Sequence, residues 1–263
     1  MTFELSIARK YIAYLLHSNN RHAVHSPFVY TLIEEVLRDQ RKFYAFGEIE
    51  KRRRRLLADH STIQITDLGA GSSLQRTTER RVWEIARYAA KPAKYGRLLF
   101  RLAHYFMPED MLELGTSLGI STSYLAAACA SARVVTLEGC PEISSIALET
   151  FRQIGLDNIR LITGNFDDTL GPALLGMKKL DLAFIDGNHR KEPTLRYFSQ
   201  CLTKTHAGSV LIFDDIHWTT EMESAWKEII AHPAVTGSID LFFMGLVFFR
   251  EEFREKQHFV LRY

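Results

Sequence analysis

The stretch of sequence that decides the fold is Asp110-Met111-Leu112-Glu113-Leu114-Gly115-Thr116-Ser117-Leu118-Gly119-Ile120-Ser121-Thr122. It predicts a short buried strand, a tight turn and the start of a helix. Gly115 and Gly119 punctuate the turn, where glycine permits positive φ angles and lets a ligand approach the backbone closely. In an open α/β sheet, the carboxyl end of the first strand is a place where small cofactors bind. We therefore expect a cofactor site at this turn.

The glycine spacing limits which cofactor this turn can hold. Dinucleotide-binding turns have the pattern G-x-G-x-x-G, but Gly115 is followed by Ser117 and Ile120 at the other two positions. A strand then follows and ends in Glu138, a position where a carboxylate can accept hydrogen bonds from ribose hydroxyls. A ribose partner without a pyrophosphate cradle suggests a nucleoside cofactor that lacks phosphates, and it disfavours a nicotinamide-dependent dehydrogenase.

From residue 111 onward, strand and helix patterns alternate strictly, which predicts a parallel sheet with helices on both faces. The expected strands are 111–114, 134–137, 159–163, 180–185 and 209–213, and the expected helices are 120–130, 141–154, 167–176, 190–203 and 219–231. Two apolar strands, 239–243 and 246–249, then flank Met244-Gly245, and so short a link requires them to be antiparallel. Residues 258–262 are a further candidate edge strand. The predicted fold is an α/β, Rossmann-like open sheet, mostly parallel with one reversed strand near its edge.

The run from Glu113 to Thr122 resembles the first motif of class I S-adenosylmethionine-dependent methyltransferases, in the form found in the catechol O-methyltransferase group. The resemblance extends over residues 96–250 and implies S-adenosylmethionine as cofactor. It places the methionine part of the cofactor on the glycine turn, the ribose on Glu138, and the adenine on Asn165 and Phe166. The implied cofactor residues are Glu113, Gly115, Thr116, Ser117, Gly119, Glu138, Asn165, Phe166 and Asp186. For Phe166, packing in the core is an equally good interpretation.

Three acidic residues follow two neighbouring strands of the predicted sheet. Asp186 ends the fourth strand, and Asp214 and Asp215 end the fifth. Adjacent parallel strands would bring these carboxylates together, and three oxygen ligands suit Mg²⁺ or a similar hard cation. Metal-dependent catechol-type enzymes have Asp-Asn on the fifth strand, so the Asp-Asp pair is more similar to metal-dependent sugar and macrolide O-methyltransferases. The alternative is that these acids only cap strand ends and helix starts.

These residues predict direct transfer of a methyl group to a hydroxyl oxygen of a small molecule. A bound cation would lower the pKa of that hydroxyl. His189 is the candidate general base, because the pKa of histidine lies near neutral pH, and Asp186 is the alternative base. His217 and Trp218 follow the fifth strand and are weaker candidates for lining the acceptor pocket.

Residues 1–93 are predicted to be an N-terminal helical or lid segment, and residues 94–263 the S-adenosylmethionine-binding domain. Within the first segment we expect a flexible glycine-containing loop at 61–73, with Gly69 and Gly71 as a possible lid over the cofactor, and a helix at 77–90. The basic run Lys51–Arg55 is interpreted as a solvated helix face rather than a phosphate site. The histidines His17, His22 and His25 are interpreted as loop and cap residues. Gly96 and Arg97 are placed near the cofactor.

Composition adds few constraints. The 263 residues carry a net charge of +2 and are 46% hydrophobic and 24% charged, as is ordinary for a globular protein. Only the run Lys51–Arg55 hints at a nucleic-acid surface. Three widely spaced cysteines, no membrane-spanning run and no signal peptide predict a cytoplasmic protein. A homo-oligomer is left open.

Two other functions fit part of this pattern. A metal-independent N-methyltransferase acting on protein or RNA would keep the cofactor turn but would not need the three acids. A non-catalytic S-adenosylmethionine-binding module would also keep Glu113 and its turn, and it would have no use for Asp186, Asp214 and Asp215.

Overall fold

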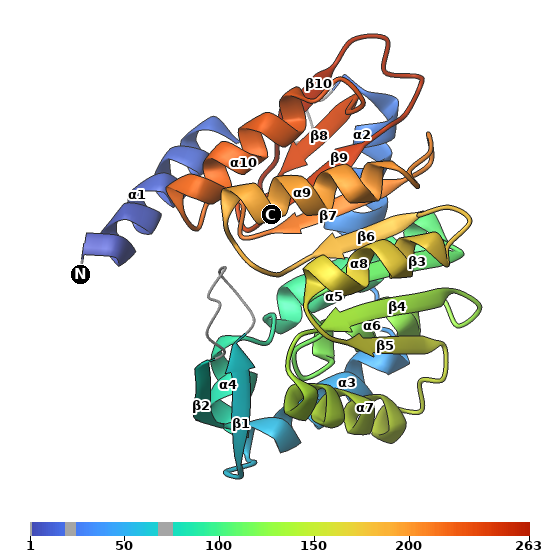
Figure 1. The fold of residues 1–263 in the computed structure, drawn as a ribbon. Helices are drawn as coiled ribbons and strands as arrows, with labels where there is room; N and C mark the ends of the chain where they lie inside the picture. Colours follow the sequence, from blue (N-terminus) through green and yellow to red (C-terminus); the bar gives the residue numbers. More distant parts are fainter. Residues whose placement is uncertain (1, 19–24, 68–75) are drawn as a thin grey trace. The chain divides into compact units, whose positions relative to one another are not determined.

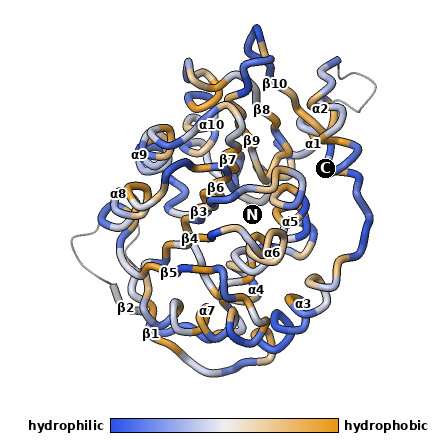
Figure 2. The backbone as a smooth tube through the Cα atoms, turned by 90° about the vertical axis from the view of Figure 1, so that its right-hand side faces the viewer, coloured by the Kyte–Doolittle hydropathy of each residue, from blue (hydrophilic) through white to orange (hydrophobic). Residues whose placement is uncertain are grey.

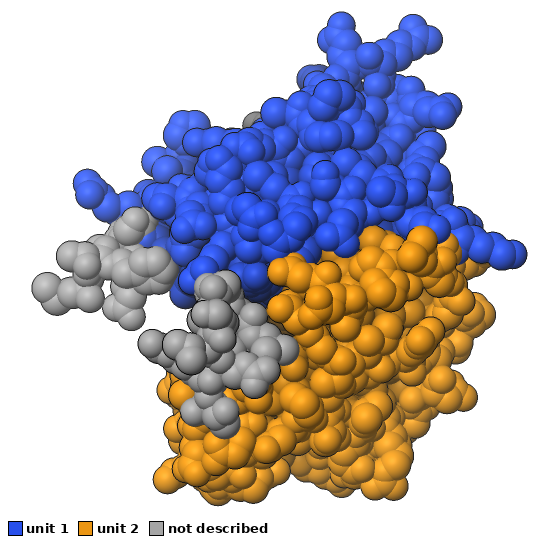
Figure 3. Space-filling model, in the orientation of Figure 1, with its two compact units in different colours: residues 1–37, 178–263 blue, residues 38–177 orange. Residues whose placement is uncertain are grey.

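A computed structural model describes residues 2–18, 25–67 and 76–263. The chain divides into two compact units, one formed by residues 1–37 and 178–263 and the other by residues 38–177 (Figures 1 and 3). We call them unit 1 and unit 2. Within the described ranges, no helix is long and apolar enough to cross a lipid bilayer. The predicted boundary near residue 93 does not coincide with this division and stays a prediction.

Unit 2 contains the glycine turn and the first three predicted strands of the α/β pattern. Its elements are α3 (Tyr44–Leu57), β1 (Thr62–Asp67), β2 (Arg76–Arg81), α4 (Val82–Tyr88), α5 (Ala93–Phe106), β3 (Asp110–Leu114), α6 (Ile120–Ala128), β4 (Arg133–Glu138), α7 (Pro141–Ile154), β5 (Ile159–Thr163) and α8 (Phe166–Leu175). The strands β3, β4 and β5 are parallel and neighbours in that order. All five residues of β3 are buried, as expected for a parallel strand covered on both faces.

The N-terminal helices of unit 2 share a hydrophobic core with the helices around the glycine turn. Phe46 and Ile49 of α3 pack in one buried cluster with Phe100 of α5 and Tyr124 of α6. Gly96 lets α5 approach α6 closely, because a Cβ atom at Gly96 would lie 2.4 Å from the ring of Tyr124. Residues 43–57 are therefore an integral part of the packing that holds the turn.

Unit 1 contains the remaining strands and the first helices of the chain. Its elements are α1 (Thr2–His17), α2 (Pro27–Leu32), the π-helical turn η2 (Ile33–Leu37), β6 (Leu182–Ile185), α9 (Lys191–Leu202), β7 (Val210–Asp214), α10 (Thr220–Ala231), β8 (Gly237–Asp240), β9 (Met244–Phe248) and β10 (Gln257–Val260). The strand order is β10-β8-β9-β7-β6. Every residue of β6, β7 and β9 is buried, and Figure 2 shows β7 and β9 mainly in the colours of hydrophobic residues.

One strand of unit 1 runs against the others. β9 is antiparallel to both β7 and β8, whereas β6 is parallel to β7 and β10 is parallel to β8. The predicted fold class, a mostly parallel Rossmann-like sheet with one reversed strand, is confirmed. The predicted link at Met244-Gly245 is wrong: residues 241–243 form the turn, and Gly245 lies inside β9.

Two predictions in the N-terminal half are also wrong. Residues 62–67, predicted to be a flexible loop, form β1, and residues 76–81, predicted to lie largely in a helix, form β2, which pairs antiparallel with β1. The helix α4 begins only at Val82. Gly69 and Gly71 lie outside the described residues, so the proposed lid stays a prediction.

Candidate active site

The glycine turn follows β3 and is held by backbone hydrogen bonds to β4. Gly115 and Gly119 have φ angles of 100° and 82°, and Ser117 between them has a φ of 48°. The N–H groups of Gly115 and Thr116 both donate to the carbonyl of Leu137, at 3.0 and 3.1 Å. The turn thus adopts the left-handed backbone conformations that its glycines were predicted to allow.

Glu113 braces this turn from inside the protein. Its side chain is fully buried. Its Oε2 atom accepts a hydrogen bond from Thr136 Oγ1 at 2.6 Å and a second, short one from Thr122 Oγ1. These contacts join β3, β4 and the first turn of α6. Direct contact of Glu113 with a cofactor stays a prediction, and its visible role is to fix the turn.

Glu138 and Ser117, two of the residues predicted to bind the cofactor, are joined at the turn by a hydrogen bond. Ser117 N donates to Glu138 Oε2 at 2.8 Å, and Cys140 N donates to Oε1 at 3.0 Å. Burial raises the pKa of the Glu138 carboxyl above its usual value, although hydrogen bonds from three backbone N–H groups oppose this shift. The carboxylate is therefore held at one orientation at the end of β4, where it can accept hydrogen bonds from hydroxyl groups.

Asn165 and Phe166 lie where β5 leads into α8. Asn165 is the N-cap of α8, and its Oδ1 atom accepts a hydrogen bond from Asp167 N at 3.1 Å. Phe166 is half-buried. Helix capping therefore accounts for the asparagine oxygen, and the predicted contacts of this pair with adenine stay predictions.

Asp186, His189 and Asp214 form a compact group in unit 1. Each offers a ligand atom, and these atoms all lie within 4.8 Å of one another. Asp214 ends β7 and is almost fully buried, and Asp186 directly follows the parallel neighbour β6. His189 Nε2 lies 3.6 Å from Asp186 Oδ1. Two carboxylates and one imidazole are a donor set that suits a divalent cation.

Two of the three predicted metal ligands thus come together, and His189 completes the group in place of Asp215. Asp215 has a left-handed backbone conformation with a φ of 53°, and its N–H donates to the carbonyl of Phe243 at 2.7 Å. The sequence signal for His189 was its position three residues after Asp186, which predicted a base rather than a member of the ligand group.

Comparison with known proteins shows what this chain is similar to. Residues 112–216 match a family model described as a methyltransferase domain. The chain is 34% identical over 135 residues to a catechol O-methyltransferase from Mycobacterium tuberculosis and 32% identical over 125 residues to one from Niastella koreensis. These alignments cover 51% and 46% of this chain, and the chain spans between half and two thirds of the two relatives, 59% and 55%.

Solved methyltransferase structures share the fold over most of the chain. The O-methyltransferase TomG from Streptomyces achromogenes, solved with S-adenosylmethionine, is 20% identical with a TM-score of 0.57. The alignment covers 84% of this chain and 95% of TomG. An O-methyltransferase from Bacillus cereus is also 20% identical, with a TM-score of 0.55 and coverage of 84% and 97%. At this identity the likeness establishes the fold of the chain and nothing further.

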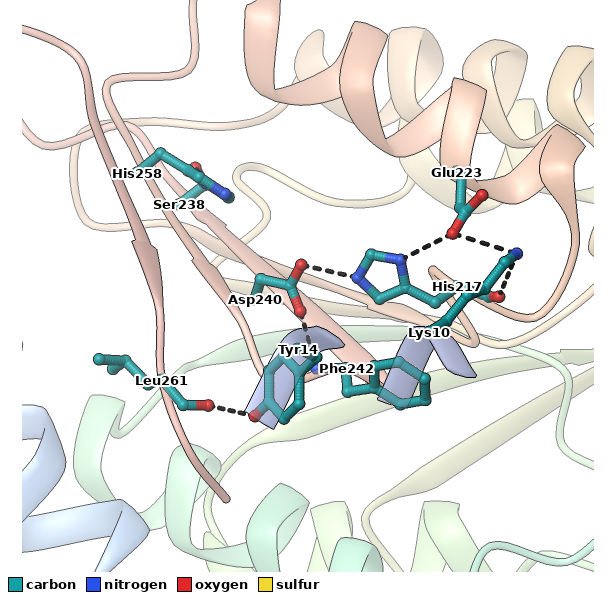
Figure 4. A network of polar contacts seen from close by, with 9 residues as sticks. All are labelled: Lys10, Tyr14, His217, Glu223, Ser238, Asp240, Phe242, His258 and Leu261. Carbon is teal, nitrogen blue, oxygen red and sulfur yellow. Dashed lines mark hydrogen bonds and ion pairs between the residues drawn. The ribbon is translucent and has the colours of Figure 1, made fainter. Parts of the chain in front are cut away.

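His217, a weak candidate from sequence, lies in a polar network of unit 1 (Figure 4). Its Nε2 atom is 2.7 Å from Asp240 Oδ2 and its Nδ1 atom is 3.3 Å from Glu223 Oε1. Lys10 of α1 lies 3.1 Å from the same Glu223 oxygen and donates to the backbone carbonyl of His217. The histidine therefore joins α1, α10 and β8, and its ring stacks on Phe242. Sequence alone offered no sign of the two carboxylates that flank it.

The charge on His217 is expected to stabilise the folded protein in a pH-dependent way. Burial lowers the pKa of His217, but hydrogen bonds and charge interactions with Asp240 and Glu223 outweigh it, so the pKa is raised. A raised folded-state pKa contributes stability that is fully present below the unfolded pKa of about 6.5 and is lost as pH rises through the folded value. We expect His217→Gln to lower the free energy of unfolding by about 1–3 kcal/mol at pH 6, and by less at pH 9.

Urea denaturation at a series of pH values measures this difference. His25→Gln is the matched control, because His25 is exposed, and it should leave stability unchanged at every pH. A destabilisation by His217→Gln that is the same at pH 6 and pH 9 would contradict the pH-dependent role of His217.

Proposed function

We propose that this chain is an S-adenosylmethionine-dependent O-methyltransferase that methylates a hydroxyl group of a small molecule with the help of a divalent cation. The observation that carries the proposal is the meeting of Asp186, His189 and Asp214 within 4.8 Å, in a chain that also has the glycine turn. A methyltransferase that modifies nitrogen without a metal would not need two carboxylates at this place.

The donor side of the proposed reaction belongs to unit 2. We propose that the backbone of the turn at Gly115 and Ser117 binds the methionine part of S-adenosylmethionine and that Glu138 accepts hydrogen bonds from its ribose hydroxyls. Ser117 N and Glu138 Oε2 are already 2.8 Å apart, so little rearrangement is needed to present both to one ligand. Pre-positioning of this kind lowers the cost of ordering the site when the ligand binds.

The acceptor side of the proposed reaction belongs to unit 1. We propose that Asp186 and Asp214 hold the cation, because carboxylate oxygens are the ligands that Mg²⁺ prefers. A cation bound there would lower the pKa of a coordinated substrate hydroxyl. Asp215, the predicted third ligand, lies outside the group of ligand atoms within 4.8 Å, and we do not assign it this role.

His189 is proposed as the group that accepts the proton of the substrate hydroxyl. It is about one-third exposed and its Nε2 atom lies 3.6 Å from Asp186 Oδ1. Histidine is the side chain that most often serves as a general base. The relatives named as catechol O-methyltransferases support a small aromatic diol as the acceptor.

The test is an assay of methyl transfer from S-adenosylmethionine to a panel of small diols, with added Mg²⁺ or with a chelator. We expect methylation of one hydroxyl that depends on the cation, and a clear loss of rate for the matched mono-hydroxy analogue, which cannot bind the cation through two oxygens. Methylation that persists fully with the chelator would contradict the metal-assisted reaction. Binding of the donor with no methylation of any diol would favour an N-methyltransferase or a non-catalytic module.

A further inference from the structure

A strongly basic pocket in unit 2 is distinct from the residues assigned to the proposed reaction. Its volume is about 550 Å³, and it is lined by the segment 39–43 and by residues of α3 and α5. Five cationic side chains line it, and they come from three separate segments: Arg41, Lys42, Arg54, Arg97 and Arg101. The size is that of a pocket for a small molecule.

The two carboxylates of the pocket already have cationic or hydroxyl partners. Asp39 accepts hydrogen bonds from Arg41 Nε at 3.0 Å and from Arg41 N at 2.8 Å. Glu50 accepts from Arg53 Nε at 3.0 Å and from the hydroxyl of Tyr124 at 2.8 Å. Although burial alone would raise it, these contacts of Asp39 with Arg41 lower the pKa of the Asp39 carboxyl. Both acids thus already have hydrogen-bond partners, and the five cationic side chains of the pocket outnumber its two carboxylates.

Three of the cationic groups have no such partner. Within the part of the chain that the structure describes, Lys42, Arg54 and Arg97 form no ion pair with a carboxylate. Like charges gathered on one concave surface repel one another. A bound anion would relieve this repulsion. If these side chains only stabilised the fold, we would expect a carboxylate of the protein to lie among them.

The surrounding residues hold these cations in place. The guanidinium of Arg97 lies over the ring of Phe46, 5.5 Å from its centroid, and that of Arg41 lies over Phe43 at 5.7 Å. Arg101 is buried, and its Nη1 atom donates to the carbonyl of Asp39 at 2.7 Å, which ties the segment 39–43 to α5. A guanidinium over an aromatic ring is held by the ring and does not use its N–H groups for that contact, which leaves those of Arg97 for an anion.

Of the four arginines in the basic run of α3, only Arg54 lines the pocket, because the other three have contacts elsewhere. Arg52 Nε donates to Thr150 Oγ1 at 3.1 Å and Arg55 Nη1 donates to Gln153 Oε1 at 3.3 Å, so both reach toward α7. Arg53 bonds to Glu50. Arg54 is exposed and lines the pocket. Its neighbours have structural contacts, whereas Arg54 is directed to a ligand-sized space.

We propose that this pocket binds a phosphorylated small molecule. Phosphate offers several acceptor oxygens and at least one full negative charge, and guanidinium groups bind it through two parallel hydrogen bonds. Arg54 and Lys42 come from different segments and face the same space as Arg97, so they can contact one phosphate group or two linked ones. The proposal does not depend on the methyl-transfer chemistry, because the pocket shares no residue with the metal or ribose positions.

Calorimetric titration of the full chain with inorganic pyrophosphate tests this proposal, in the absence of divalent cations and at physiological salt. We expect saturable binding at one site per chain. The double variant Lys42→Gln/Arg54→Gln should lower the affinity for pyrophosphate at least tenfold, because it removes two charge-assisted hydrogen-bond donors, which are stronger than neutral ones. Arg55→Gln is the control for loss of a positive charge on α3, since it removes one charge at the position next to Arg54, on a side chain that contacts Gln153, and it should change the affinity less than twofold.

Citrate distinguishes phosphate recognition from general attraction of anions. It carries a charge similar to that of pyrophosphate but presents carboxylates, and we expect it to bind at least tenfold more weakly. Three results would overturn the proposal: no saturable heat with pyrophosphate, an equal loss of affinity in Arg55→Gln and the double variant, or equal affinity for citrate. Circular dichroism spectra and melting curves of each variant establish that the comparison is between folded proteins.

Discussion

Asp214→Asn is expected to abolish binding of a divalent cation and to lower methyl transfer by about 100-fold or more. Asp214 ends β7, is 1% exposed and lies in the group with Asp186 and His189. Asparagine keeps the size of the side chain but removes the negative charge, so the remaining donors no longer neutralise a doubly charged ion. Loss of a partner outside the ligand set already costs 10- to 100-fold in typical metal sites, and loss of a direct ligand should cost at least as much.

The measurement has two readouts, Mn²⁺ binding followed by electron paramagnetic resonance and methyl transfer to the best diol of the panel. Asp157→Asn is the control, because Asp157 is exposed and is not a member of this group. His189→Gln separates the two roles of the site: as the proposed base, it should lower the rate and keep Mn²⁺ binding. If Asp214→Asn binds Mn²⁺ as tightly as the unchanged protein, the metal assignment is wrong. If His189→Gln also loses the ion, His189 is a ligand and not the base.

The strands and helices after residue 110 could be predicted because strand patterns and helix patterns alternate there, which favours a parallel α/β sheet. β3 and β7 are mainly apolar and every one of their residues is buried, and each is followed by a helix. The strand at 159–163 and the helix at 141–154 were predicted with the observed bounds. Helix α7 has proline at its first position and glycine just past its end, which are strong local signals for both boundaries.

The hairpin β1–β2 could not be predicted, because its second strand carries no pattern. Residues 76–81 read Arg-Thr-Thr-Glu-Arg-Arg, with no alternation of apolar and polar side chains. The pairing rests on contacts distant in sequence: Gln64 N donates to Glu142 Oε2 at 2.6 Å, and Gln64 Nε2 donates to Glu79 Oε1 at 2.8 Å. Such contacts exist only in the folded chain, so tertiary structure overrides local propensity here.

The link between β8 and β9 was misplaced for a similar reason. Gly245 is a turn residue by propensity, but in the fold it makes room for a side chain, because a Cβ atom there would lie 2.6 Å from the ring of Trp226. The turn instead forms at Phe242, which has a φ of 70° and whose N–H donates to Asp240 Oδ1 at 2.7 Å. A single sequence does not show whether a glycine is required by close packing or by a turn.

The candidate site was predictable to the extent that it depends on strand ends. Asp186 and Asp214 come together because parallel strands end at the same edge, which the sequence pattern predicts. The contribution of His189 depends on the path of the loop after Asp186, where Asn188 has a φ of 58°. Loop conformations of this kind are set by packing and carry no periodic signal.

Gly119→Ala is expected to destabilise the protein by about 3–5 kcal/mol, because alanine at this position is both strained and overpacked. Gly119 is the N-cap of α6 with a φ of 82°. A Cβ atom there would lie 2.6 Å from Cε1 of Phe151 and 3.4 Å from the Cα of Ala147. Phe151 is only 4% exposed, so its ring has little space to move aside. Chemical denaturation measures the loss.

Gly155 separates the two causes. It has a φ of 81°, almost the same as Gly119, but a Cβ atom there would meet nothing within 4 Å. Gly155→Ala therefore carries only the backbone strain, about 1–2 kcal/mol. The excess loss in Gly119→Ala measures the collision with Phe151, and Phe151→Leu should recover part of it in a double-mutant cycle. Equal losses at Gly119 and Gly155 would mean that α6 and α7 do not pack so closely at the glycine turn, and that the strain at Gly119 comes from its backbone conformation alone.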